Sequence, residues 1–229
     1  MQAKANYRNG RVSILKKENR KNFILAGFFL GAFGLWTLLV SFVDVQSIGP
    51  RDSAVGFATL NRFVHRLTGV HMILYTVTDW LGLVPLLVAA GFGLLGLFQW
   101  FRRKQLLKVD FSILILGGFY LVTAAFFLLF EKAVVNYRPV LIEGILEASY
   151  PSSTTLLVMC VMPTAMMQLR SRIKNPHLRK WVLLLLAAFT IFMVLGRLIS
   201  GVHWVTDIIG GALLSTGLVL LYRALCNLR

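Results

Sequence analysis

Three side chains with chemical potential stand close together near the C-terminal end of the chain: Arg197, His203 and Asp207. Apolar runs flank them, so we expect them at a membrane boundary, where a charged group is costly unless it is paired or faces a watery cavity. On a helix, Asp207 would hold one ring nitrogen of His203 while the other nitrogen points away. An imidazole oriented by a carboxylate, with a guanidinium nearby, suits nucleophilic attack on a phosphoryl group. An Arg–Asp pair and an interfacial histidine with purely structural roles would explain the same residues equally well.

The composition is typical of a membrane protein. Of the 229 residues, 57% are hydrophobic and only 14% are charged, whereas about a quarter of the residues of a soluble domain are charged. The net charge of +15 indicates basic cytoplasmic loops beside anionic lipids, and we expect no nucleic-acid partner. Cys160 and Cys226 fall in apolar runs and are expected to be buried thiols.

The apolar runs predict an all-α, polytopic membrane protein with six transmembrane helices. We expect a basic cytoplasmic tail over residues 1–21 and one membrane domain over residues 22–229. The predicted spans cover residues 22–43, 73–101, 110–130, 152–169, 181–196 and 203–222. Between the first two spans, residues 54–68 predict an amphipathic helix that lies in the membrane interface. An ordinary connecting helix packed on the bundle is an equally good interpretation of that segment.

Two further polar stretches follow the third span. The first runs from Lys132 to Arg138-Pro139, where the proline should end the helix. In the second, Pro151, Ser152 and Thr154 are typical of a helix start, whose free backbone N–H groups form an anion site.

The distribution of basic residues predicts which side of the membrane these stretches occupy. With the N-terminus inside, eighteen Lys or Arg residues fall on the inner side and six on the outer side, as the positive-inside rule requires. Both termini are therefore expected in the cytoplasm. All three polar stretches then converge on the outer face, which favours a functional over a purely structural interpretation.

The three stretches resemble the type 2 phosphatidic acid phosphatase family of integral membrane phosphatases. The third motif of that family is Arg, five residues, His, three residues and Asp, and it is matched in full by Arg197, His203 and Asp207. Its first motif is Lys, six residues and Arg-Pro, and it is matched at Arg138-Pro139. The order of the motifs and the six-span layout also agree, so the resemblance covers about residues 22–222.

The sequence departs from the family at two positions. Lys132 lies one position too close to Arg138, and Glu131 occupies the place of the family lysine. The second motif, Pro-Ser-any-His, is matched at its Pro and Ser, but Thr154 stands where the family has His. A threonine hydroxyl is too weak an acid to donate the proton that this His gives to the leaving group.

The resemblance implies a mechanism without a metal or other cofactor. His203 would attack phosphorus and become a phosphohistidine, and Asp207 would orient it. The phosphate oxygens would be held by Lys132, Arg138, Ser152, Ser153 and Arg197, with Thr154 on the side of the leaving group. The substrate would be a lipid phosphate in a bacterial cell membrane, and the active site would lie on the outer face.

Three functions stay open at this point. The first is a lipid phosphatase, either with a leaving group that needs no acid or with a substitute acid such as His65, His71 or water. The second is a lipid phosphotransferase, and the third is a catalytically weak relative that binds or transports phospholipids. Because a diphosphate expels a better leaving group than a monoester does, Thr154 favours a lipid diphosphate such as a polyprenyl diphosphate.

Overall fold

The computed structural model describes residues 2–228, with side chains from residue 16 onward, and consists mainly of helices. The helices are α1 (Gln2–Phe42), α2 (Ala58–Thr68), α3 (Met72–Leu81), α4 (Leu83–Arg103), α5 (Phe111–Lys132), α6 (Ser153–Arg172), α7 (Pro176–Ile199) and α8 (Val205–Cys226). Two short strands, β1 (Gln46–Ser47) and β2 (Ala54–Val55), pair antiparallel between α1 and α2. Single 3-10 turns cover Pro50–Asp52 and Leu106–Lys108.

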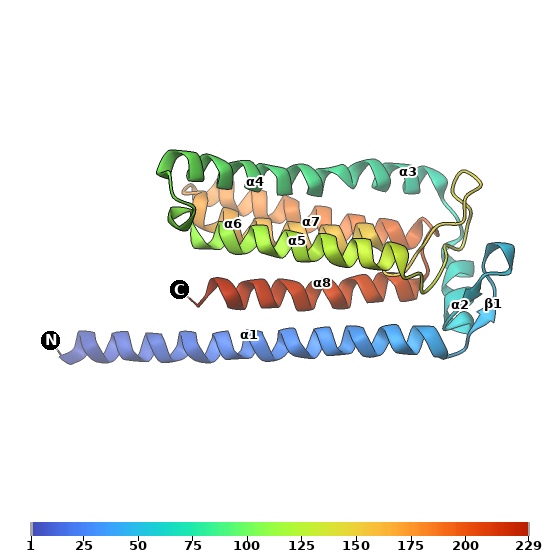
Figure 1. Ribbon diagram of the computed structural model, residues 1–229, viewed down its shortest axis with the longest axis horizontal. Coiled ribbons are helices and arrows are strands. Elements are labelled where there is room, and N and C mark those ends of the chain that lie inside the picture. The colour runs from blue at the N-terminus through green and yellow to red at the C-terminus, as the bar shows by residue number, and fades with distance from the viewer. Residues whose placement is uncertain (1, 229) are drawn as a thin grey trace.

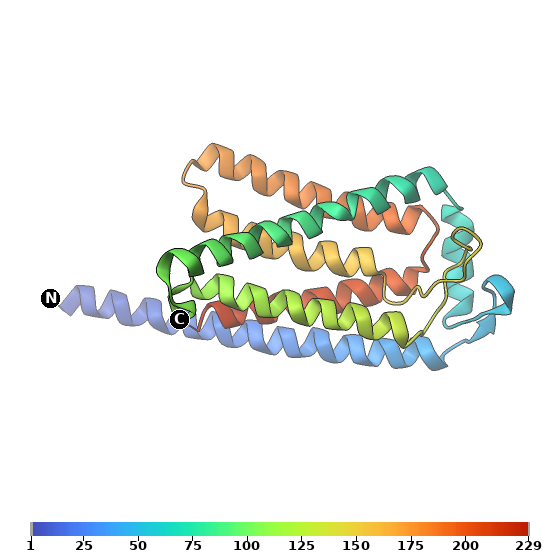
Figure 2. The same cartoon turned by 45° about the horizontal axis from the view of Figure 1, so that its top comes forward.

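The long helices run alongside one another as a bundle (Figure 1). α8 packs against α1 on one side and against α6 on the other, and α7 packs against α6. The short α2 crosses one end of the bundle, next to the β-hairpin and the loop that follows α5, and both chain ends lie at the opposite end (Figure 2). The structure therefore separates the termini from the polar loops, as the predicted topology requires, although which end faces the cytoplasm stays a prediction.

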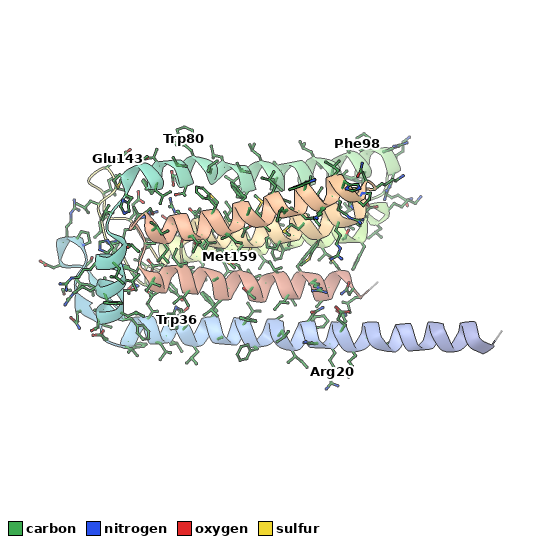
Figure 3. The ribbon with its side chains drawn as sticks, turned by 180° about the vertical axis from the view of Figure 1, so that it is seen from behind. Arg20, Trp36, Trp80, Phe98, Glu143 and Met159 are labelled. Atoms are coloured by element: carbon green, nitrogen blue, oxygen red, sulfur yellow. The ribbon has the colours of Figure 1, made fainter. Side chains whose placement is uncertain are left out.

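Among the described residues, five helical segments are long and apolar enough to cross a bilayer, so the chain is a multi-pass membrane protein. They are Lys16–Phe42, Met72–Arg103, Phe111–Lys132, Pro176–Ile199 and Val205–Cys226. Large apolar side chains on these helices point away from the bundle, as Trp80 and Phe98 do in Figure 3. Such exposed apolar surface suits contact with lipid.

The predicted fourth span, residues 152–169, corresponds to α6, which is less apolar than the other five. α6 packs against α4, α5, α7 and α8, and its buried residues include Thr155, Thr164 and Gln168. A helix surrounded by protein needs less apolar surface than a helix that faces lipid, because its polar groups can find partners inside the bundle. A membrane crossing by α6, and with it the count of six, stays a prediction.

Two predicted segments differ from the observed elements. The helix expected over 54–68 begins only at Ala58, because residues 54–55 pair with β1 around the Gly49-Pro50 turn. The second span is divided at Gly82 into α3 and α4. Asn61 on α2 donates from Nδ2 to Thr206 Oγ1 of α8 over 3.0 Å. This hydrogen bond connects α2 to the helix bundle. A location of α2 in the membrane interface stays a prediction.

Cys160 and Cys226 are both free thiols. Cys160 is buried in α6 and Cys226 is half-buried at the end of α8, so the expected full burial holds for the first only.

Candidate active site

The turn between α7 and α8 places His203 outside both helices. Gly201 in this turn has a φ of +68°, and a Cβ atom there would lie 1.9 Å from the carbonyl oxygen of Gly69, so only glycine fits. His65 of α2 lies on the same turn, with Nε2 3.1 Å from the Gly201 carbonyl oxygen. The sixth predicted span thus begins at Val205 and not at 203, and His203 and Asp207 do not share a helical face.

Ser149 connects His203 to Asp207. Its hydroxyl donates to Asp207 Oδ2 over 2.5 Å, and its oxygen lies 3.0 Å from His203 Nδ1, whereas the direct distance from Nδ1 to Oδ2 is 3.7 Å. Because the one hydroxyl proton goes to the carboxylate, Oγ accepts from an Nδ1–H group. His203 therefore carries its proton on Nδ1, and the other ring nitrogen, Nε2, has no hydrogen-bond partner within the described side chains.

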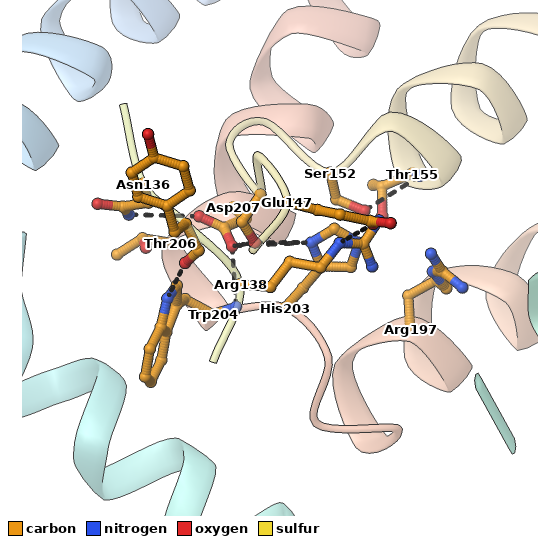
Figure 4. A network of polar contacts seen from close by, with 12 residues as sticks. Asn136, Arg138, Glu147, Ser152, Thr155, Arg197, His203, Trp204, Thr206 and Asp207 are labelled. Atoms are coloured by element: carbon orange, nitrogen blue, oxygen red, sulfur yellow. Dashed lines mark hydrogen bonds and ion pairs between the residues drawn. The ribbon is translucent and has the colours of Figure 1, made fainter. Parts of the chain in front are cut away.

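The carboxylate of Asp207 has two further hydrogen-bond partners. The backbone N–H of Trp204 donates to Oδ2 over 2.9 Å, and Asn136 Nδ2 lies 3.4 Å from Oδ1. Figure 4 shows these polar groups converging on Asp207 and His203. Asp207 and His203 are thus connected through Ser149, and the orienting role of Asp207 stays a prediction.

His203 is fully enclosed and lies near two guanidinium groups. Burial, followed by the positive charges of Arg138 and Arg197, holds the pKa of His203 well below its usual value, against the smaller, opposing effect of a hydrogen bond to the backbone of Ser149. The imidazole is therefore neutral near pH 7, which leaves the lone pair on Nε2 free to attack an electrophile.

Arg138 and Arg197 each have a carboxylate partner. Arg138 Nε lies 3.0 Å from Glu147 Oε2, and Arg197 Nη1 lies 3.4 Å from Asp79 Oδ1. The Tyr75 ring packs on both guanidinium groups, whose Cζ atoms lie 6.0 Å (Arg138) and 5.0 Å (Arg197) from the ring centroid. Arg138 Nη1 and Arg197 Nε are buried and lack a hydrogen-bond partner among the described residues. Such N–H groups suit an anion with several oxygen atoms.

The loop after α5 brings Arg138 and Ser149 to His203. It folds back on itself, with an isolated bridge between Tyr137 and Ala148. The Ser149 N–H donates to the Asn136 carbonyl over 2.9 Å. Ser149 was not among the predicted site residues, because a lone serine in a loop gives no periodic or spacing signal.

The start of α6 borders a cavity of about 450 Å³ between α3, α4, α5 and α6. Ser152 is buried at the N-cap, where its Oγ accepts from the Thr155 N–H over 3.4 Å. Ser153 and Thr154 line the cavity together with Asp79, and the rest of the lining is mainly apolar: Leu83, Leu86, Ala89, Ala124, Phe127, Leu156, Leu157 and Val161. The cavity is thus polar where Asp79, Ser153 and Thr154 line it and mainly apolar elsewhere.

Comparison with known proteins supports the resemblance. The sequence profile of the PAP2 superfamily matches residues 126–228, which contain Arg138, the start of α6, His203 and Asp207. This C-terminal part of the chain is therefore similar to the PAP2 superfamily. The crystal structure of a transmembrane PAP2-type phosphatidylglycerolphosphate phosphatase from Bacillus subtilis superposes with a TM-score of 0.56, at 18% identity over 86% of this chain and 94% of that chain. At this identity the likeness shows a shared fold, and a search of curated proteins found no match.

Among the predicted site residues, Lys132 is not joined to the others by any contact of the described side chains. It is exposed at the end of α5 and makes no ion pair with the described residues. Glu131, at the position of the PAP2 lysine, instead lines a cavity of about 40 Å³ with Arg138 and Glu147. A phosphate contact of Lys132 stays a prediction.

The described side chains contain no group of three or more His, Cys, Asp or Glu residues that could hold a metal ion. Metal-independent chemistry stays a prediction.

Proposed function

We propose that this chain is a membrane phosphatase that hydrolyses lipid phosphates or diphosphates, with His203 as the nucleophile. The observation that carries the proposal is the orientation of His203: Ser149 holds the ring proton on Nδ1, and the unpaired Nε2 is left to attack. Arg138 and Arg197 would hold the phosphate oxygens. Phosphoryl transfer requires mainly positioning and positive charge around a loose transition state, and these residues supply both.

The reaction has two steps. In the first, His203 Nε2 bonds to phosphorus while the bond from phosphorus to the lipid oxygen breaks, which gives a phosphohistidine. The positive charge that develops on the ring is shared with Asp207 through the Ser149 hydroxyl. In the second step, water attacks phosphorus, the P–N bond breaks and inorganic phosphate leaves. No step needs a metal ion.

The apolar cavity supports a lipid as the substrate. A hydrocarbon chain would lie among the side chains of α4, α5 and α6, while its phosphate would extend to Arg197 beside Asp79. The PAP2 relative from Bacillus subtilis is a phosphatase of phosphatidylglycerolphosphate, a lipid with the same division between an apolar chain and a terminal phosphate.

Thr154 bears on the class of lipid phosphate. A monoester expels an alkoxide, which needs a proton, and general acid catalysis contributes about 10²–10⁴-fold. A diphosphate expels a phosphate monoester, which needs little protonation. The leaving phosphate would meet the N-terminus of α6, with its hydroxyl groups of Ser153 and Thr154 and its positive helix dipole. We therefore propose a preference for lipid diphosphates, such as polyprenyl diphosphates, over monoesters.

The test is phosphate release from matched lipids by the purified full-length protein. His203→Ala should abolish release, chelators should do little, and acid-labile, alkali-stable phosphate should be trapped on His203 after quenching. Full activity of His203→Ala, or complete loss with a chelator, would contradict the mechanism. Transfer of the phosphoryl group to a lipid alcohol without phosphate release would identify a phosphotransferase, and lipid binding without turnover would identify a binding protein.

A further inference from the structure

Thr154 leaves the leaving group without a proton donor at the position where the family has histidine. His65 and His71, which the sequence suggests as substitute proton donors, each contact a backbone carbonyl oxygen. His65 Nε2 lies 3.1 Å from the Gly201 carbonyl oxygen, and His71 Nε2 lies 2.8 Å from the Thr68 carbonyl oxygen. Neither histidine lines the cavity that contains Thr154.

Asp79 does line that cavity, together with Ser153 and Thr154. It lies in α3, outside the region 126–228 that the superfamily profile matches, and its carboxylate is 3.4 Å from Arg197 Nη1 with 57% of the side chain exposed. Asp79 thus borders Arg197, which would hold the phosphate, on one side and the apolar cavity on the other. In a lipid phosphate, the ester oxygen lies between the phosphorus and the hydrocarbon, which is where these two regions meet.

We propose that Asp79 is the proton donor to the leaving oxygen of lipid monoesters, an inference that rests on the proposed phosphatase function. In the first step, the Asp79 carboxyl gives its proton to the lipid oxygen as the P–O bond breaks and the bond from His203 Nε2 to phosphorus forms. In the second step, the Asp79 carboxylate takes a proton from the attacking water. The hydroxyl goes to phosphorus, the P–N bond breaks, and the carboxyl group is restored.

Asp79 can reach both the substrate and water. It is the counter-ion of Arg197, so a phosphate bound by Arg197 would lie beside its carboxyl group. Asp79 is also more than half exposed, so water can exchange protons with it.

Glu147 provides a matched comparison, because it pairs with Arg138, the other arginine that would hold the phosphate, over 3.0 Å. Glu147 lines the small cavity of about 40 Å³ beside Ser149 and not the apolar cavity that contains Thr154. If carboxylates act here only as counter-ions, removing either one should have the same kind of effect. If Asp79 is the acid, the two variants should differ.

The experiment measures turnover of phosphatidic acid, a monoester, and of farnesyl diphosphate by purified full-length variants. Asp79→Asn should lower monoester turnover about 10²–10⁴-fold relative to diphosphate turnover. Both activities share any effect of losing the counter-ion of Arg197, and the remaining diphosphate turnover reports correct folding. Adding Thr154→His to Asp79→Asn should restore monoester turnover. Glu147→Gln should change both activities by a similar factor. Asp79→Glu keeps a carboxyl group and should keep the ratio of the two activities near that of the wild type.

Three results would overturn the role of Asp79: an equal loss on both lipids in Asp79→Asn, a selective monoester loss in Glu147→Gln alone, or a wild type that turns over only the diphosphate. If Asp79→Asn does not fold, a changed ratio of the two activities in Asp79→Glu would refute the role as well. Failure of the phosphatase function itself looks different, because His203→Ala would then keep the activity or the wild type would turn over neither lipid.

Discussion

Removing the hydroxyl of Ser149 tests the connection between His203 and Asp207. In Ser149→Ala, His203 Nδ1 loses its acceptor at 3.0 Å, and Asp207 Oδ2 loses one donor but keeps the Trp204 N–H at 2.9 Å. The remaining Nδ1–Oδ2 distance of 3.7 Å is too long for a hydrogen bond. The ring proton is then free to move to Nε2, which would block the nucleophilic lone pair.

The size of the effect follows from the charge that develops on the ring. As Nε2 bonds to phosphorus, the ring becomes cationic, and Ser149 carries that charge toward Asp207. A hydrogen bond to a charged group contributes about 1.5–3 kcal/mol, and about 1.36 kcal/mol corresponds to a factor of ten. We therefore expect kcat to fall about 10- to 150-fold. The fall would be at the lower end if the imidazole shifts to contact Asp207 directly.

The assay is steady-state phosphate release, with kcat and KM measured separately. KM should change little, because the hydrogen bonds of the Ser149 hydroxyl go to His203 and Asp207 and not to the arginines that would hold the phosphate. Ser215→Ala is the control: it removes another buried hydroxyl, which in α8 bonds to the Gly211 carbonyl oxygen, and it should leave kcat near the wild-type value. An unchanged kcat in a folded Ser149→Ala protein would refute the proposed connection.

Three further predictions concern topology, the turn and pH. A cysteine introduced at 102–109 should be protected from an impermeant thiol reagent in intact cells while one at 140–148 is labelled, and the reverse pattern would invert the membrane orientation. Gly201→Ala should lower thermal stability by at least about 1–3 kcal/mol, because its Cβ would lie 1.9 Å from a backbone oxygen, whereas Gly27→Ala in open space should not. Because the pKa of His203 is lowered, its ring stays neutral as pH falls until that lowered pKa is reached, so the acid limb of kcat/KM should lie below pH ~6.5. Arg138→Gln removes a charge that disfavours the imidazolium and should move this limb to higher pH, whereas Arg138→Lys should not; a limb that Arg138→Gln leaves unmoved would contradict the assignment to His203.

The helices were largely predictable because apolar length is a strong signal in membrane proteins. The segments around 22–43, 110–130 and 181–196 correspond to α1, α5 and α7. The division of the second span at Gly82 was not predicted, because one glycine in an apolar run is compatible with a continuous helix. The lower apolarity of α6 is explained by its packing, since α4, α5, α7 and α8 surround it.

The candidate site was predictable where spacing carries information. Arg138, Arg197, His203 and Asp207 gather as the motifs imply. Ser149 was missed because its contact with Asp207 crosses 58 positions. Tyr75 and Asp79 were missed for a similar reason: they reach Arg197 from α3. An acidic residue at the edge of an apolar run is a recognisable signal for Asp79, but its partner becomes known only from the fold.

The polar character of α6 has a consequence for the biogenesis of the protein. A nascent helix that carries Thr155, Thr164 and Gln168 is poorly held by lipid alone, because these groups find partners only when the neighbouring helices surround them. α7 follows after only three residues, 173–175, and is strongly apolar. We therefore expect α6 to enter the bilayer together with α7 as a helical hairpin. In a nascent chain that ends before α7, the start of α6 with Ser153 and Thr154 would lack its packing partners. We expect such a chain to be recognised by the quality control of the cell.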